Sequence, residues 1–207
     1  MAAKWVCVVA KRPVVIEGEK VALGPVVEED LDKFWFWVND KTVTQYLSDR
    51  LFLGVYTRRM EEKWIRSVLE GDRNTLTFVI LLKPRYEVIG VISLDKVNWI
   101  NRNAELGVFI GSKDLWGQGL GSEAIMLLLD YAFNVLGLVK VYLRVIEYNR
   151  RAIRAYVKVG FKEVGRLRKH IFRGGKFWDV IIMEIYSDEF DQKKSKIREK
   201  CSDLLHK

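Results

Sequence analysis

The sequence predicts a mixed α/β fold of the α+β class, folded as one domain. Its length of 207 residues fits a single domain with short appendages. Hydrophobic residues make up 49% and charged residues 30%, which is the balance of a folded chain and not of a disordered one. Strand-like and helix-like segments follow one another in mixed order, with no internal repeat and no Pro/Ser-rich linker between them.

The first half of the chain predicts short strands and two amphipathic helices. Residues 14–27 read as a strand pair around a turn at 17–20. Residues 28–39 predict a helix, because acidic residues fill the first turn and apolar residues at helical spacing share one face. Residues 58–70 predict a second helix, which Gly71 ends. Three strands are then expected, at residues 75–82, 88–95 and 104–110.

The second half predicts two more helices, two of whose ends are marked by glycines. Gly137 and Gly160 each follow a helical pattern, and the turn at 173–175 separates two strand patterns of a hairpin. The expected elements are helices at 122–136 and 150–159 and strands at 140–146, 162–171 and 176–185.

The C-terminal segment differs in character from the rest. Ser187 is a helix-capping residue, and acidic residues follow it. Around a basic stretch, apolar side chains then recur at helical spacing at Phe190, Ile197, Cys201 and Leu204. We expect residues 187–207 to form a helix that docks on the body or on a second subunit in a homodimer. A basic arm that grips nucleic acid is the alternative.

Several classes of protein and site are excluded or disfavoured. Cys7 and Cys201 lie near opposite ends and no CxxC pair occurs, so neither a disulfide framework nor a cysteine zinc site is expected. His170 and His206 are the two histidines, too few for a multi-histidine metal centre, and we expect no metal. No apolar run reaches the roughly 18–20 residues of a membrane span, and the run at 5–10 is too short for a secretory core. We therefore expect a cytoplasmic protein.

The positive charge is concentrated in one region. Residues 140–176 hold 12 basic residues against two acidic ones, a net charge of +10, whereas the whole chain carries +8. Such a regional charge suggests an anionic ligand, which could be a phosphorylated cofactor, RNA or an acidic protein surface. A solvated basic face without a ligand is the alternative.

The most informative segment is a strand, a glycine-rich loop and a helix. Gly117, Gly119 and Gly121 alternate directly before the helix pattern. Glycines permit positive φ and let an anion approach backbone amides, and a helix N-terminus attracts negative charge. The segment lacks the Gly-Lys-Ser/Thr of a P-loop and the GxGxxG spacing of a dinucleotide fold. The loop is therefore a candidate phosphate cradle of another kind.

Two signatures in this region resemble one family. Residues 116–124, WGQGLGSEA, resemble the acetyl-CoA loop of the GNAT N-acetyltransferase superfamily, in its Rim-type branch of ribosomal-protein N-terminal acetyltransferases. Residues 149–161, NRRAIRAYVKVGF, match the family's second signature. The resemblance extends over residues 17–186, with residues 1–16 as an N-terminal extension and 187–207 as the tail. The chain departs from the family pattern at Trp116 and Gly24.

The resemblance implies a fold and a cofactor site. It implies a central, mostly antiparallel sheet, splayed between its fourth and fifth strands, which end at Ile110 and begin at Lys140, with acetyl-CoA in the opening. The pantetheine arm would pair with the fourth strand, and the loop amides would hold the pyrophosphate. The implied cofactor contacts are Val108, Phe109, Ile110, Gly117, Gln118, Gly119, Leu120, Gly121, Ser122, Asn149, Arg151 and Ala152.

Tyr156 and Glu105 are the implied catalytic residues. Tyr156 lies two helical turns after Asn149, so both share one helix face, and its hydroxyl would protonate the leaving thiolate. Packing under the sheet is the alternative for Tyr156, and a helix N-cap is the alternative for Asn149. Glu105 would serve as the base that deprotonates the amine, directly or through a water, with Glu29 and Asp95 as runners-up. A structural role or simple solvent exposure is the alternative for Glu105. No cysteine lies in the matched motifs, so we expect direct transfer in a ternary complex, with an oxyanion hole from the amide of Phe109 or Ile110.

The acceptor is the least determined feature. The resemblance implies a primary amine, with a protein N-terminal α-amine first, and a pocket built from residues 39–57 and the hairpin near 173–177. The aromatic residues of these segments, some of which must belong to the core, are Tyr46, Phe52, Tyr56, Phe172, Phe177 and Trp178. A polyamine, another small amine or an RNA-linked amine is the alternative, as is a non-catalytic CoA- or RNA-binding module. The basic hairpin disfavours a polycation unless the carboxylates at 28–30 line the entry.

Overall fold

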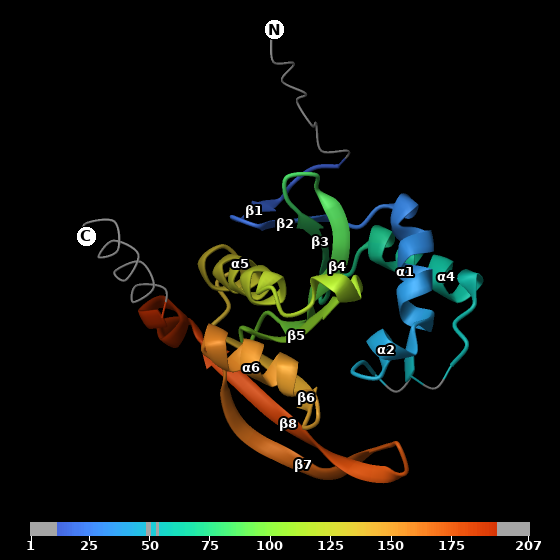
Figure 1. Ribbon diagram of the computed structural model, residues 1–207. Helices are drawn as coiled ribbons and strands as arrows, with labels where there is room; N and C mark the ends of the chain where they lie inside the picture. Colours follow the sequence, from blue (N-terminus) through green and yellow to red (C-terminus); the bar gives the residue numbers. More distant parts are fainter. Residues whose placement is uncertain (1–11, 49–50, 53, 194–207) are drawn as a thin grey trace, which may run out of the picture.

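A computed structural model describes residues 12–48, 51–52 and 54–193, which form an eight-stranded sheet with helices on both faces (Figure 1). The strand order is β1-β2-β3-β4-β5-β6-β8-β7. The strands are β1 (Ile16–Glu17), β2 (Val21–Pro25), β3 (Leu76–Leu82), β4 (Glu87–Asn98), β5 (Asn103–Ile110), β6 (Lys140–Ile146), β7 (Lys162–Arg173) and β8 (Lys176–Tyr186).

The pairing between β5 and β6 is parallel and short, and it opens the sheet. All other neighbouring strands pair antiparallel. β5 and β6 share a register only from Asn103 and Lys140 to Glu105 and Tyr142, whereas β4 stays paired with β5 as far as Ile110. The two halves of the sheet therefore separate beyond Glu105 and leave a V-shaped opening. The predicted splayed, mostly antiparallel sheet is confirmed.

Helices cover the two faces of the sheet (Figure 1). The helices are α1 (Leu31–Asn39) after a 3₁₀ turn (Glu28–Asp30), α2 (Lys41–Thr44), α4 (Arg58–Glu70), α5 (Leu120–Asn134) after a 3₁₀ turn (Lys113–Leu115), and α6 (Arg150–Val159). Helices α1 and α4 pack on one face, while α5 and α6 pack on the other.

Alternate residues of the strands fill two separate cores. Leu23 and Ile80 face the core under α5, whereas Ala22, Val79 and Leu81 face the core under α1 and α4. Successive side chains of a strand point to opposite faces, and a sheet covered on both sides needs apolar residues on both. This explains the continuous apolar runs of β2 and β3.

Three of the differences from the sequence prediction bear on the site, and the bounds of several other elements shift by a few residues. The short helix α2 was not expected, and β4 continues past the predicted end at residue 95 to Asn98. Helix α5 begins at Leu120, two residues before the expected start, because Gly119 takes the left-handed conformation that ends the loop (φ 84°). The early start brings Gly121, the last glycine of the glycine-rich segment, into the first turn of α5.

The end of the described chain packs onto the body. Residues 187–193 are helical, and the buried ring of Phe190 lies 5.6 Å from that of Phe133 on α5. Ile197, Cys201 and Leu204 lie outside the described residues, so the docking of the rest of the tail stays a prediction. The run at 5–10 also lies outside them. No helix among the described residues is long and apolar enough to cross a membrane.

Candidate active site

The opening between β5 and β6 holds a cavity of about 760 Å³ that most of the predicted site residues line. At its edge, the Gly111 amide donates to the Ile89 carbonyl, and the Phe109 carbonyl is turned onto Gly90 of β4. Backbone groups alternate along a strand, so those of Val108 and Ile110 face the opening. Of the three residues expected to contact the pantetheine arm, Val108 and Ile110 thus have backbone groups that are not paired with β4, and the ring of Phe109 packs edge-on against Trp37.

The glycine-rich loop has the conformation that an anion cradle needs. Gly117 and Gly119 take φ values of 81° and 84°, and a Cβ on either would meet no neighbouring atom. The amides of Leu120, Gly121 and Ser122 lie in the first turn of α5, where backbone N–H groups have no partner within the helix. The loop therefore presents donors and open space to a pyrophosphate.

Not every side chain in the loop is available to a ligand. The Gln118 side chain donates to the Asp114 carbonyl at 3.1 Å, which leaves its backbone as the group that can contact a cofactor. The Trp116 indole donates to the Ile110 carbonyl at 2.7 Å and so braces the loop against the end of β5. The Arg151 guanidinium lies 3.5 Å from the Trp116 ring centroid, and burial lowers its pKa.

Helix α6 adds positive charge that the sequence analysis had not assigned to the site. Arg154 and Lys158 line the cavity together with Arg151. These residues are three, four and seven positions apart, which places them along one side of a helix. Their helical spacing inside the basic region was the available signal. They suit the phosphates of coenzyme A.

Asn149 and Tyr156 stand on the cavity side of α6. The Asn149 side chain accepts from the Ala152 amide at 3.2 Å, so it caps the helix and also lines the cavity. Tyr156 is buried, and desolvation raises its pKa to about 12. Its hydroxyl therefore stays protonated at neutral pH and can donate a proton.

Two carboxylates lie side by side on the strands that border the opening. Asp95 of β4 and Glu105 of β5 are register partners, and both line the cavity. Burial acts to raise the pKa of Glu105, but its hydrogen bonds with Lys96 and Arg144 outweigh burial and lower it. Burial raises the pKa of Asp95, against the opposing effect of a hydrogen bond from Ser93. The two neighbours therefore differ in their readiness to take up a proton.

The acceptor side is closed by the loop after α2 and by the β7–β8 hairpin. Tyr46 and Leu47 line the cavity, as does His170 of β7. The Arg173 guanidinium donates to the carbonyls of Gln45 and Leu47 at 2.6 and 3.0 Å and thereby joins the hairpin to the loop. The predicted acceptor segment thus borders the cavity, although residues 49, 50 and 53 lie outside the described ones.

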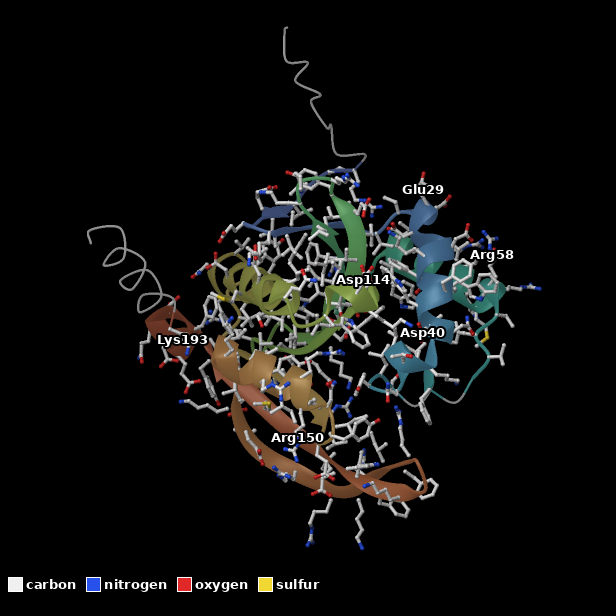
Figure 2. The ribbon with its side chains drawn as sticks, viewed as in Figure 1. Glu29, Asp40, Arg58, Asp114, Arg150 and Lys193 are labelled. Carbon is white, nitrogen blue, oxygen red and sulfur yellow. The ribbon has the colours of Figure 1, made fainter. Side chains whose placement is uncertain are left out.

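Some predicted acceptor residues lie elsewhere. The rings of Phe172 and Phe177 are more than half exposed at the hairpin tip. Glu29 lies in the 3₁₀ turn that precedes α1 (Figure 2), and Asp30 forms an ion pair with Arg12 at 2.7 Å. None of the carboxylates at 28–30 lines the cavity, so they do not line an entry for a polycation, and Glu29 is not placed to act as the base.

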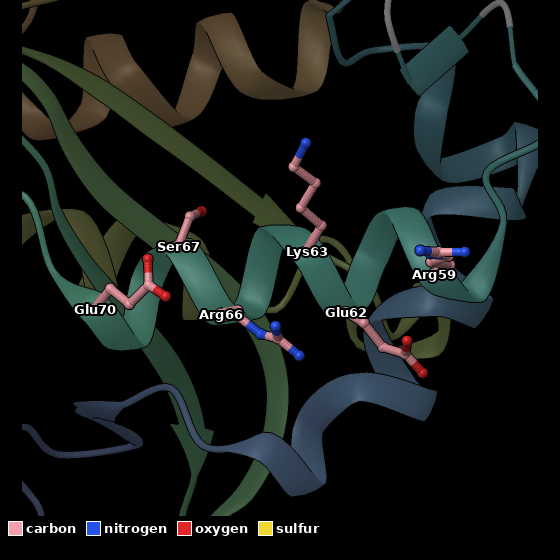
Figure 3. A pocket seen from close by; sticks show the side chains of 6 residues that line it. All are labelled: Arg59, Glu62, Lys63, Arg66, Ser67 and Glu70. Carbon is pink, nitrogen blue, oxygen red and sulfur yellow. The ribbon is translucent and has the colours of Figure 1, made fainter.

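Helix α4 borders another hollow, of about 590 Å³, on its outer face (Figure 3). Its lining residues are Arg59, Glu62, Lys63, Arg66, Ser67 and Glu70. All belong to one helix, and none comes from the strands that border the V, so this hollow is not the candidate active site. Among the described residues, no group of three His, Cys, Asp or Glu side chains could hold a metal ion.

Comparison with known proteins identifies the family. A family model for the acetyltransferase (GNAT) domain matches residues 20–162. The chain belongs to the GNAT acetyltransferase family. It is therefore an N-acetyltransferase with acetyl-CoA as its co-substrate, and the splayed sheet and glycine-rich loop form its GNAT domain.

The relatives of this GNAT domain include polyamine acetyltransferases. The chain is 36% identical over 171 residues to a spermidine N(1)-acetyltransferase of Escherichia coli K12, covering 82% of this chain and 88% of the relative. It is 30% identical over 173 residues to an uncharacterized N-acetyltransferase, p20, of Bacillus licheniformis, covering 83% and 96%. A crystal structure of spermidine N-acetyltransferase from Vibrio cholerae in complex with CoA and spermine matches with a TM-score of 0.74 and 27% identity, covering 84% and 99%. These relatives do not support the Rim-type branch.

Proposed function

We propose that this GNAT enzyme acetylates an amino group of a polyamine such as spermidine. The observation that carries the proposal is Asp95, a carboxylate on the wall of the cavity that is not paired with a cation among the described residues. An anionic side chain attracts a polycation and holds its reactive end next to the opening. A protein N-terminal α-amine, the first expectation from the sequence, has no comparable support.

The relatives support the same substrate class. Two of the proteins to which the chain is similar are spermidine acetyltransferases, and one of them is described with spermine and CoA. The similarity extends over more than four-fifths of this chain. No relative named above is a nucleic-acid-binding protein, and RNA binding is not part of the proposal.

The basic region at residues 140–176 is compatible with a cationic substrate, because several of its basic side chains are paired with carboxylates. Four of its basic side chains form ion pairs with carboxylates: Lys140 with Glu184, Arg144 with Glu105, Lys162 with Glu189, and Arg166 with Glu163. Arg151 and Arg154 line the cavity from α6, where they suit the phosphates of the donor. The positive charge of this region thus serves internal contacts and acetyl-CoA.

Different residues of the opening then bind the cofactor, donate the proton and stabilise the oxyanion. Val108 offers backbone groups to the pantetheine arm as an added strand would, whereas the Ile110 carbonyl already accepts from the Trp116 indole. The amine attacks the thioester directly, and Tyr156 protonates the departing sulfur. The Ile110 amide, which faces the opening, is the better placed of the two expected oxyanion donors.

The test is acetyl transfer to a panel of amines. Purified enzyme is supplied with labelled acetyl-CoA and with spermidine, butylamine or a short peptide with a free N-terminus. We expect spermidine to have the highest kcat/KM and its advantage over butylamine to shrink as salt screens the carboxylates. Preferred acetylation of the peptide, or no acetylspermidine at any salt concentration, would overturn the proposal.

A further inference from the structure

We infer that Asp95 is the group that takes the proton from the attacking amine, and that Glu105 is a positioning residue. The inference deepens the proposed function, since it concerns the same cavity. It rests on acetyl transfer to an amine and holds whichever amine is the acceptor.

Both oxygens of Glu105 are already bound to cations. Its Oε1 accepts from Arg144 Nε at 2.7 Å, and its Oε2 accepts from Lys96 Nζ at 2.7 Å. A carboxylate in two charge-assisted hydrogen bonds is stabilised in its ionised form and resists protonation. Glu105 also joins three strands, because Lys96 belongs to β4 and Arg144 to β6. Glu105 thus connects the strands on the two sides of the opening at its base.

Asp95 has a free oxygen in the same cavity. Its Oδ2 accepts from Ser93 Oγ at 2.9 Å, and Oδ1 has no hydrogen-bond partner within the described part of the chain. Burial raises the pKa of this carboxyl, which makes it a better proton acceptor than an ordinary aspartate.

Gly107 keeps the approach to Asp95 open. A Cβ at this position would lie 2.7 Å from Ser93 Oγ and 3.0 Å from Asp95 Oδ2. A side chain there would crowd the hydrogen-bonded pair and fill the space beside the carboxylate. The glycine therefore has a role at the acceptor side that the glycine-rich loop does not share.

Asp95 and Tyr156 approach the opening from opposite faces of the sheet. Leu94 and Leu106 belong to the same core as Tyr156. Their neighbours in the strands, Asp95 and Glu105, therefore face the other side of the sheet. The other charged and titratable groups that line the same cavity are Tyr46 after α2, Glu105 of β5, Arg144 of β6, Tyr156, Arg151, Arg154 and Lys158 of α6, and His170 of β7. Of these, Glu105 is the other carboxylate, and its oxygens are occupied.

The protons balance as follows. The bound ammonium gives one proton to the Asp95 carboxylate, and the neutral amine forms a C–N bond to the thioester carbon. As the C–S bond breaks, Tyr156 protonates the thiolate, and the second amine proton leaves and restores the tyrosine. Asp95 returns its proton to solvent, so one proton is released for each amide formed.

The test compares Asp95→Asn with Glu105→Gln in the full chain. We expect Asp95→Asn to lower kcat by about 10²–10⁴-fold near pH 7, and the deficit to narrow as the pH approaches the amine's own pKa of about 10. We expect Glu105→Gln to keep kcat within about tenfold and to retain the wild-type pH profile, while KM for the amine rises. Asp95→Ala should regain turnover when formate or acetate is added, which a purely structural role would not allow.

Controls separate misfolding and substrate identity from the inference. Each variant must bind acetyl-CoA with wild-type affinity and keep its circular dichroism spectrum; where Asp95→Asn fails this, the formate rescue of Asp95→Ala decides. A wild-type kcat for Asp95→Asn would overturn the inference. So would a kcat–pH profile of Glu105→Gln from which the ionisation of the proton-accepting group has disappeared. Absence of wild-type turnover on spermidine counts against the polyamine proposal alone, and the series is then run on the amine that the wild type accepts.

Discussion

At the scale of single residues, burial acts on Tyr156, the group proposed to protonate the leaving thiolate. Tyr156 is buried on α6, and desolvation raises its pKa to about 12, so the hydroxyl remains protonated over the working range. We expect Tyr156→Phe to lower kcat by about a hundredfold or more, because the ring still packs but the proton is gone. Acetyl-CoA affinity measured by calorimetry should stay within about twofold. Unchanged turnover would remove Tyr156 from the mechanism.

The loop glycines give a second prediction at this scale. Gly119 takes φ 84° at the start of α5, in open space, so an added methyl group causes backbone strain but no collision. We expect Gly119→Ala to cost about 1–2 kcal/mol of unfolding free energy and to weaken acetyl-CoA binding, because the amides no longer converge. Gly165→Ala is the matched control, since its Cβ also meets nothing and its φ is not positive. Equal effects of the two substitutions on the acetyl-CoA Kd would contradict this account of the loop.

At the scale of elements, one buried arginine couples the β7–β8 hairpin to the acceptor loop. Arg173 is 5% exposed and donates to the carbonyls of Gln45 and Leu47. We expect Arg173→Met to raise KM for the amine by about tenfold and to leave acetyl-CoA affinity unchanged, because two carbonyls lose their donor while the buried volume is kept. Steady-state kinetics with each substrate varied in turn provide the measurement. Arg168→Met, an exposed change on the same hairpin, should alter neither constant, and a parallel rise there would show a general charge effect instead.

Elements were predictable where their signals are local. Helix α6 was predicted with its observed ends because Asn149 caps it and Gly160 stops it, and both signals are visible in the sequence. Helix α2 was missed because it is only four residues long and shows no apolar period. The predicted end of β4 fell at Asp95, where its register with β5 shifts and where Lys96 takes φ 52°. Irregularity inside a long strand looks like its end when only the sequence is known.

At the scale of the whole molecule, what the sequence could not supply is the pairing of distant segments. The glycine-rich loop and Tyr156 each lie in one continuous motif, so they could be proposed from the sequence. The partners of Glu105 come from β4 and from β6, the latter 39 positions away, and only strand register brings them together. The choice between Glu105 and Asp95 therefore depends on tertiary structure.

The same pair gives opposite contributions to the stability of the whole fold. The pKa of Glu105 is lowered from 4.5, so its stabilising contribution is complete above that value and disappears as the pH falls through the folded-state pKa. The pKa of Asp95 is raised from 3.8, so its ionised form destabilises the fold at neutral pH, and this cost disappears as the pH falls through its folded-state value toward 3.8. Glu105→Gln should therefore lower the free energy of unfolding at pH 7, and Asp95→Asn should raise it.

The differences in unfolding free energy between each variant and the wild type should vanish in acid, at a pH below both the folded-state and the unfolded-state pKa of the substituted group. Urea unfolding of the three proteins at about pH 7, pH 5 and pH 3 measures them. Glu163→Gln is the control, because its pair with Arg166 is half-exposed and exposed pairs contribute little. If Asp95→Asn were less stable than wild type at neutral pH, the aspartate would be held by compensating contacts and would not carry the strain expected of a buried proton acceptor. A gain in stability together with a loss of turnover would instead mark Asp95 as a group kept for catalysis at the expense of the fold.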